Sequence, residues 1–101
     1  MARIELTPGA IEDLDRFFDH LRSFEISQSR SRVIGIVESL SVLSHSPQIG
    51  RPFAPGLREL IIGRRPNIYL ALYRYIDAID TVFILAFRQQ NEQDYKRHFN
   101  G

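Results

Sequence analysis

The spacing of the hydrophobic residues changes once along the chain, and this change constrains the fold more than any other feature. A period of three to four residues indicates one face of a helix, whereas a period of two indicates a strand. From Leu57 onward the apolar residues recur at steps of two. Before that point they recur at steps of three and four in two stripes: Ile11, Leu14, Phe17, Phe18, Leu21 and Phe24, then Val33, Ile34, Ile36, Val37, Leu40 and Leu43. The pattern therefore predicts two helices followed by a set of strands, which is an α+β arrangement.

The boundaries of the first half follow from turn and capping residues. Residues 2–6 alternate and predict a short N-terminal strand. Thr7-Pro8 predicts the start of a helix of about 16 residues, since threonine caps free amides and proline suits the first helical position. Ser27-Gln28-Ser29 interrupts the stripes and offers caps for a second helix, which we expect to end around Ser46-Pro47. The short interruption predicts an antiparallel helical hairpin. Gly35 within the second helix indicates either a close helix–helix approach or a tolerated flaw.

The second half predicts a three-stranded antiparallel meander. A loop rich in proline and glycine covers 46–56, and a polar C-terminal segment predicts a short helix over 91–99. The strand over 81–87 is apolar on both faces, so we expect it inside the sheet. The remaining predicted elements are strands over 57–62 and 68–76, with turns over 63–67 and 77–80. The element order is β-α-α-β-β-β in a single domain spanning 1–101, with the helical hairpin packed on one small, mainly antiparallel sheet.

Composition excludes several classes of protein and site. The chain has no cysteine, which excludes disulfides and thiolate zinc sites and fits a reducing compartment. Its apolar runs are too short for a membrane helix, and the N-terminus has no apolar stretch of the kind found in signal peptides. We therefore expect a cytoplasmic protein without a membrane association. His20, His45 and His98 lie far apart in the sequence, so we expect no metal site and no cofactor.

Basic residues gather in the second half of the chain. Residues 1–50 hold five Lys/Arg and seven Asp/Glu, a balance of −2, whereas residues 51–101 hold eight and five, a balance of +3. Such an excess favours a polyanion or an acidic protein segment as partner, although a solvated surface is an equal alternative. The arginines suit bidentate contacts to phosphate or carboxylate, and the tyrosines suit stacking or interface contacts. In contrast, Asp13, Asp15 and Asp19 on the first predicted helix indicate a hydrated face.

Three stretches of the second half, 56–64, 69–75 and 80–88, resemble the C-terminal half of the RelE/ParE superfamily of bacterial toxins. The opening Ile4–Ala10 with Asp13-Leu14 resembles the first strand and helix entry of that superfamily. The Ser46-Pro47 and Gly50-Arg51-Pro52 segments resemble the loop before its sheet. The resemblance covers nearly the whole chain. It implies the toxin of a type II toxin–antitoxin system of the plasmid-stabilising kind, which inhibits growth and is neutralised by a cognate antitoxin.

Within this superfamily the chain resembles the ParE branch, which inhibits DNA gyrase, more than the RelE branch, which cuts mRNA on the ribosome. In the RelE branch an arginine stands three residues before the tyrosine of the middle strand, and here Leu70 stands three residues before Tyr73. Arg88 and Tyr95 match the remaining RelE pattern, but the intervening positions are neutral or acidic. The resemblance therefore implies a degraded or absent nuclease site, and a protein that inhibits gyrase by binding it rather than as an enzyme.

Several alternatives remain open at this stage. If the chain is a ribosome-dependent mRNA endoribonuclease, Arg88 and Tyr95 are its catalytic residues; a toxin that has lost activity and only binds antitoxin is a further alternative. Arg58 has an alternative structural role, paired with Glu12 or Asp13. Direct nucleic-acid binding is left open. If the chain is a gyrase inhibitor, we expect the target-binding residues to be Arg58, Arg64, Arg65, Arg88 and Tyr95. We expect the antitoxin to be a disordered or helical segment that wraps the helical hairpin and a sheet edge.

Overall fold

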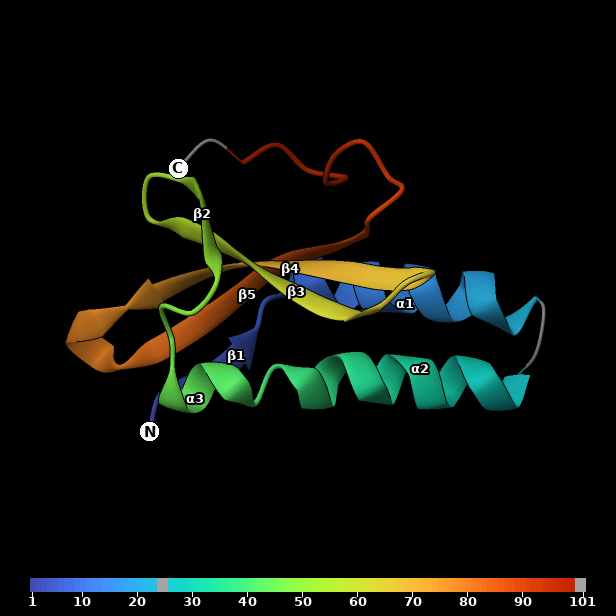
Figure 1. Cartoon of the computed structure of the whole chain (residues 1–101), viewed down its shortest axis with the longest axis horizontal. Coiled ribbons are helices and arrows are strands. Elements are labelled where there is room, and N and C mark those ends of the chain that lie inside the picture. Colours follow the sequence, from blue (N-terminus) through green and yellow to red (C-terminus); the bar gives the residue numbers. More distant parts are fainter. Residues whose placement is uncertain (24–25, 100–101) are drawn as a thin grey trace.

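A computed structural model describes residues 1–23 and 26–99 of the chain; for residues 26 and 27 it describes the backbone alone. Its helices lie on one side of a twisted sheet and its C-terminal segment lies on the other (Figure 1). The elements are β1 (Arg3–Leu6), α1 (Pro8–Arg22), α2 (Ile26–Ser39), α3 (Val42–His45), β2 (Arg51–Ala54), β3 (Leu57–Arg64), β4 (Asn67–Ile76), the 3-10 turn η1 (Asp77–Ile79) and β5 (Thr81–Gln89). The predicted α+β class is confirmed. The predicted order β-α-α-β-β-β is confirmed in part, because the second predicted helix is divided into α2 and α3 and the strand β2 precedes the meander.

The sheet has five strands in the order β1-β5-β4-β3-β2. β3, β4 and β5 form the predicted antiparallel meander, and β1 pairs in parallel with β5. β5 therefore lies inside the sheet, as its two apolar faces predicted. The expected loop over 46–56 contains a strand instead, because β2 turns back at Pro55-Gly56 and pairs with β3. Its proline, Pro52, is tolerated because β2 is an edge strand.

The helical region begins as the sequence predicts and then departs from the prediction. The Thr7 hydroxyl accepts a hydrogen bond from the Ala10 amide at 3.3 Å, so Thr7 is the N-cap of α1. The expected break at 27–29 is wrong, because α2 already begins at Ile26 and includes those residues. The second helical region is divided into α2 and α3, and α3 ends at His45, just before Ser46-Pro47. Phe24, the last member of the first predicted stripe, lies outside the described residues.

Gly35 and the C-terminal segment overturn two further expectations. A methyl group added at Gly35 would meet nothing within 4 Å, so this glycine does not mark a close helix–helix contact. The expected helix over 91–99 is not formed; the residues up to Phe99 follow turns and bends. Turn-forming contacts replace it, since the Gln89 amide donates to Glu92 at 2.7 Å and the Tyr95 amide donates to Asp94 at 2.8 Å. Contacts with the sheet outweigh the weak helical propensity of this polar stretch.

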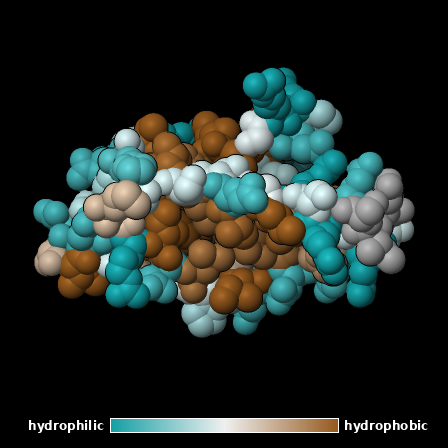
Figure 2. Space-filling model, turned by 90° about the horizontal axis from the view of Figure 1, so that it is seen from below, coloured by the Kyte–Doolittle hydropathy of each residue, from teal (hydrophilic) through white to brown (hydrophobic). Residues whose placement is uncertain are grey.

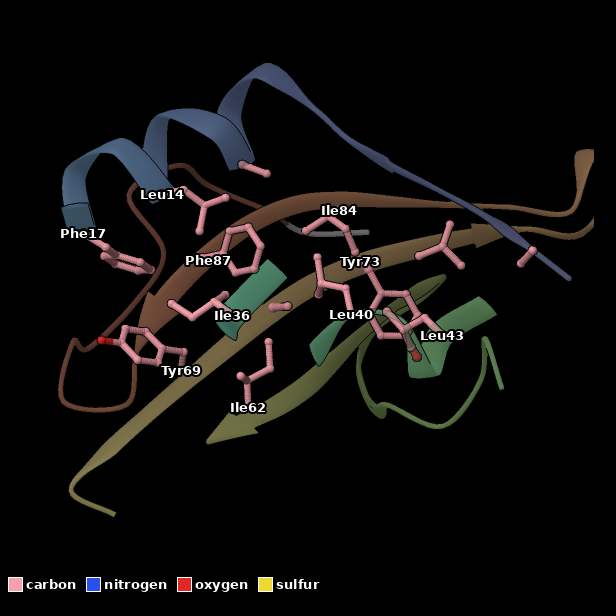
Figure 3. Packing of buried hydrophobic residues seen from close by; sticks show 14 residues of the cluster. Leu14, Phe17, Ile36, Leu40, Leu43, Ile62, Tyr69, Tyr73, Ile84 and Phe87 are labelled. Atoms are coloured by element: carbon pink, nitrogen blue, oxygen red, sulfur yellow. The ribbon is translucent and has the colours of Figure 1, made fainter. Parts of the chain in front are cut away.

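Two apolar clusters pack on opposite faces of the sheet. The larger cluster joins the helices to the sheet, with Phe17 of α1 against Tyr69 of β4 at a ring-centroid distance of 5.2 Å (Figure 3). The smaller cluster joins Leu57, Leu72 and Ala86 to Tyr95. The alternation along β4 explains this division: Tyr69, Ala71 and Tyr73 face the helices, whereas Leu72 faces the C-terminal segment. This segment therefore closes the second face of the sheet. Within residues 1–23 and 26–99, no helix is long and apolar enough to cross a membrane.

Candidate functional site

A buried carboxylate, that of Glu59, organises the side chains beneath the C-terminal segment. Glu59 is only 4% exposed and lies on β3. The Tyr95 hydroxyl donates to its Oε2 at 2.5 Å, and Arg51 Nε donates to its Oε1 at 3.0 Å. An Arg88 terminal nitrogen lies 3.9 Å from Oε2. One carboxylate thus joins two strands and the C-terminal segment to β3.

The sheet register explains why these groups meet. Arg51 of β2 stands directly opposite Glu59 in the antiparallel pair. Arg88 of β5 stands opposite Leu70 of β4, which is itself 2% exposed. Arg88 also donates to the Glu92 carbonyl oxygen at 2.7 Å and lies 5.3 Å from the centre of the Tyr95 ring. This guanidinium is therefore occupied by a carbonyl, an aromatic face and a carboxylate.

Tyr95 is held as a neutral hydroxyl donor. Burial raises the pKa of its hydroxyl most, and the hydrogen bond to Glu59 and the Glu59 charge raise the pKa further, while Arg88 lowers it. Phe53 and Phe99 contact the ring edge-to-face at centroid distances of 5.8 and 6.1 Å. A hydroxyl whose pKa is raised stays protonated near neutral pH, and here it donates that proton to a carboxylate. It therefore cannot act as a general base. The structure thus brings Arg88 and Tyr95 together, but in a closed arrangement.

A second buried carboxylate fastens the far part of the C-terminal segment to α1. Asp13 is 2% exposed, and its Oδ2 accepts from the Phe87 amide at 2.9 Å and from Arg97 at 2.7 Å. Arg16 lies 3.6 Å from its Oδ1. The expectation that Asp13 belongs to a hydrated face is wrong, because Asp13 shares the inward-facing spacing of Ala10, Leu14 and Phe17. That spacing was a signal available in the sequence.

The role of Glu59 was not predicted from the sequence. Glu59 alternates with Leu57 and Ile61, so it was a charged residue on an apolar strand face. Such a residue requires a partner when buried. The identity of the partner was not readable, because Tyr95 lies 36 residues away.

The other predicted site residues lie elsewhere. Arg58 stands opposite Tyr73, which faces the helices, and donates to the Gly50 carbonyl oxygen at 2.8 Å. The alternative pairing of Arg58 with Glu12 or Asp13 is wrong, since Asp13 is paired with Arg97 and Arg16. Arg64 and Arg65 are exposed at the turn between β3 and β4. The five candidates therefore fall into three separate groups, of which only Arg88 and Tyr95 are in contact.

The helical side of the molecule carries exposed hydrophobic residues. Figure 2 shows hydrophobic side chains gathered across the middle of this side. The exposed large apolar residues of the helices are Ile11 of α1, Ile34 and Val37 of α2, and Val42 of α3, with exposed fractions from 38% to 49%. A contiguous apolar area of this kind is typical of a protein-binding surface. Among the described residues, no group of three or more acidic or histidine side chains converges as in a metal site.

Comparison with known proteins agrees with this architecture. Similar solved structures include the chromosomal ParDE toxin–antitoxin system from P. aeruginosa, which is 28% identical over 88% of this chain and 96% of that chain, with a TM-score of 0.75. The RelBE2 toxin–antitoxin complex from Mycobacterium tuberculosis is 24% identical over 88% and 98%, with a TM-score of 0.61, and shares the fold. The intact RelBE toxin–antitoxin complex of E. coli is 14% identical over 91% and 100%, with a TM-score of 0.57, and also shares the fold.

None of the curated protein sequences compared with the chain is significantly similar to it. The model of one protein family, described as the ParE toxin of the type II toxin–antitoxin system parDE, matches residues 4–94. This match includes every helix and strand described above except Arg3, the first residue of β1. The chain therefore belongs to the ParE toxin family, within the RelE/ParE toxin superfamily.

Proposed function

We propose that this ParE toxin inhibits DNA gyrase by binding it, and that a cognate antitoxin neutralises it. The observation that carries the proposal is the carboxylate of Glu59 at the Tyr95 hydroxyl, where a nuclease of this superfamily would receive a phosphate. A buried negative charge at that place repels a phosphodiester. The family match favours the gyrase-directed branch independently of this geometry.

The charges around Tyr95 argue against mRNA cleavage. Cleavage requires an acid, a base and a positive group that stabilises the charge developing on the phosphate. Arg88, the positive group nearest Tyr95, already contacts Glu59 and the Glu92 carbonyl oxygen. The position that would supply a second cation holds Leu70, a buried apolar residue. The geometry thus supports a protein that acts by binding.

The contact surfaces differ from those expected at first. Arg88 and Tyr95 are largely buried, so we assign them the task of positioning the C-terminal segment rather than contacting the target. Arg58, Arg64 and Arg65 have no carboxylate within 4 Å among the described residues, and the last two are exposed. These three arginines remain our candidates for contact with the gyrase complex.

The apolar helical side is the surface that we assign to the antitoxin. Ile34 and Val37 of α2 are about one helical turn apart and both exposed, with Ile11 on the neighbouring helix α1. An amphipathic segment of the antitoxin that folds on binding would cover such residues. Replacing Ile34 and Val37 by serine should weaken antitoxin binding, and replacing the exposed Ile79 of η1 by serine should leave it unchanged. Equal weakening by both changes would contradict this assignment.

Two parallel assays test the function. Purified chain should inhibit supercoiling by gyrase and increase the amount of cleaved DNA trapped by detergent, and added antitoxin should prevent both effects. In a translating extract the same chain should leave mRNA intact. Codon-specific mRNA cleavage would establish the nuclease function instead, and an absence of both activities together with harmless expression in cells would indicate an inactive antitoxin-binding protein.

A further inference from the structure

The turn between β3 and β4 carries two arginines whose charges are not compensated. Most basic side chains of the described chain pair with carboxylates: Arg3 with Glu5, Arg16 with Asp13 and Glu92, Arg22 with Asp19, Arg51 and Arg88 with Glu59, Lys96 with Glu92, and Arg97 with Asp13. Arg64 and Arg65 have no such partner within the described residues, and both are exposed. From Leu60 to Ile76 the chain contains no acidic residue at all. The positive potential at this end is therefore not cancelled locally.

The backbone fixes this turn in place. Arg64 pairs with Asn67 as the last rung between β3 and β4. Gly63, just before it, has a φ of +89°, and a methyl group added there would lie 2.5 Å from the Asn67 carbonyl oxygen. Only glycine allows this close approach, which turns the chain so that the consecutive residues Arg64 and Arg65 stand at the end of a long hairpin. Arginines presented on a fixed turn lose less freedom on binding than arginines on a mobile segment.

A polar groove adjoins the two arginines. A cavity of about 110 Å³ lies between the turn and the end of β5, and the residues lining it include Pro66, Asn67, Gln89, Gln90 and Asn91. The Gln90 amide donates to the Ile68 carbonyl oxygen at 2.9 Å, so a backbone hydrogen bond joins the two segments that line the groove. Glu92, the acidic residue that follows Asn91 most closely, pairs with Arg16 and accepts a hydrogen bond from the Gln89 amide. The surroundings thus offer hydrogen-bond donors without a repelling charge.

We propose that this turn binds the phosphodiester backbone of duplex DNA, with Arg64 and Arg65 on phosphates and the groove amides on adjoining phosphate and sugar oxygens. Guanidinium groups bind phosphate oxygens in pairs, and amide side chains supply the sequence-independent contacts that position a protein on a duplex. The choice of DNA over RNA rests on the proposed gyrase function, because gyrase holds a duplex at the point of cleavage. The toxin would then contact both the enzyme and its bound DNA.

The first test measures DNA binding by the chain alone. Fluorescence anisotropy with a labelled duplex should show an affinity whose logarithm falls with the logarithm of salt concentration with a slope of about −1.8, for two phosphates neutralised. That slope corresponds to a loss of roughly twelvefold between 50 and 200 mM salt. Amide signals of Gly63 to Asn67 and Gln89 to Asn91 should move in an NMR titration with the same duplex.

A matched pair of variants isolates the turn. Arg64→Gln with Arg65→Gln should abolish the salt-dependent binding, whereas Arg30→Gln with Arg32→Gln on α2, which changes the net charge equally, should leave it within twofold. Equal losses in both variants, or no loss in the first, would overturn the proposal. Tighter binding of an RNA hairpin than of the DNA duplex would overturn the choice of DNA.

A gyrase assay separates this inference from the function on which it rests. The Arg64 and Arg65 double variant should trap less cleaved DNA than the unaltered chain, whereas the Arg30 and Arg32 double variant should trap as much. If the unaltered chain does not affect gyrase yet binds DNA through the turn, the proposed function fails and the DNA contact stands. If the unaltered chain inhibits gyrase and the double variant traps as much cleaved DNA, the inference fails and the function stands.

Discussion

Replacing Asp13 by asparagine removes one negative charge from the contact that fastens the C-terminal segment to α1. Asparagine keeps the size of the side chain and an oxygen that can accept a hydrogen bond from the Phe87 amide. In the unaltered chain this amide lies 2.9 Å from Oδ2 of Asp13. The lost interaction is the attraction to Arg97, at 2.7 Å, and to Arg16, at 3.6 Å. The variant therefore tests the charge pair with the fewest other changes.

The magnitude follows from the burial of each partner. Breaking a fully buried ion pair costs about 3–5 kcal/mol, whereas an exposed pair contributes about 0–1 kcal/mol. The Asp13 side chain is 2% exposed and both guanidinium side chains are 34% exposed, which places this contact between the two cases. We expect Asp13→Asn to lower the free energy of unfolding by about 2–3 kcal/mol, or the melting temperature by roughly 10–20 °C for a chain of this length.

Urea denaturation followed by circular dichroism measures this difference. Asp19→Asn is the matched control, because Asp19 pairs with Arg22 at 3.7 Å while both side chains are more than half exposed. The control should lose less than about 0.5 kcal/mol. A double-mutant cycle with Arg97→Gln should give a coupling energy of about 1 kcal/mol or more. An Asp13→Asn variant as stable as the control would refute the reasoning that this carboxylate is buried with its partners.

Four further outcomes follow from the same structure. Tyr95→Phe should lower stability by about 1.5–3 kcal/mol in urea denaturation, because the charged acceptor Glu59 loses its hydroxyl donor; an unchanged midpoint would contradict that contact. Leu70→Arg should destabilise the chain by more than about 3 kcal/mol and produce no mRNA cleavage, since it buries an unpaired charge beside Arg88. Gly63→Ala should cost at least about 1 kcal/mol in thermal melts. Its control Gly35→Ala, at a helical position with free space, should raise the free energy of unfolding by up to about 1 kcal/mol. The contribution of Tyr75 and Tyr95 to stability should be constant below pH 10, the ordinary tyrosine pKa, and fall as the pH rises from 10 through 12. Hydrogen bonding to Asp80 raises the pKa of Tyr75 to about 12, and burial raises the pKa of Tyr95 further. Both pKa values are therefore higher in the folded chain than in the unfolded chain. A urea midpoint equal at pH 8 and pH 11 would refute this.

The periodic elements were predictable because local patterns determine them. The stripe from Ile11 to Leu21 predicted α1, and the alternation over 68–76 predicted the faces of β4, since each pattern reports which side of one element is buried. β2 was missed because its pairing depends on β3 rather than on its own composition. The C-terminal segment was predicted as a helix for the same reason: Arg97 and Tyr95 hold it through partners more than thirty residues away.

The candidate site was only partly predictable. The residue types were correct for Arg88 and Tyr95, which do meet. Their chemistry depends on Glu59, whose contact with Tyr95 required the register of the sheet and the path of the C-terminal segment together. A resemblance between sequences identifies which residues are replaced, as at Leu70. It does not report which carboxylate lies beside those that remain.

The pairing of Asp13 with Arg97 also bears on how the protein forms. These residues are 84 positions apart, so during synthesis the carboxylate on the first helix emerges long before its guanidinium partner. The Phe87 amide, its other buried partner, also arrives late. Contacts between such distant positions slow folding, because the chain must close a long loop before they form. A nascent toxin would therefore remain incompletely assembled until residue 97 is made, and substitutions or insertions that disturb residue 97 would prolong that immature period.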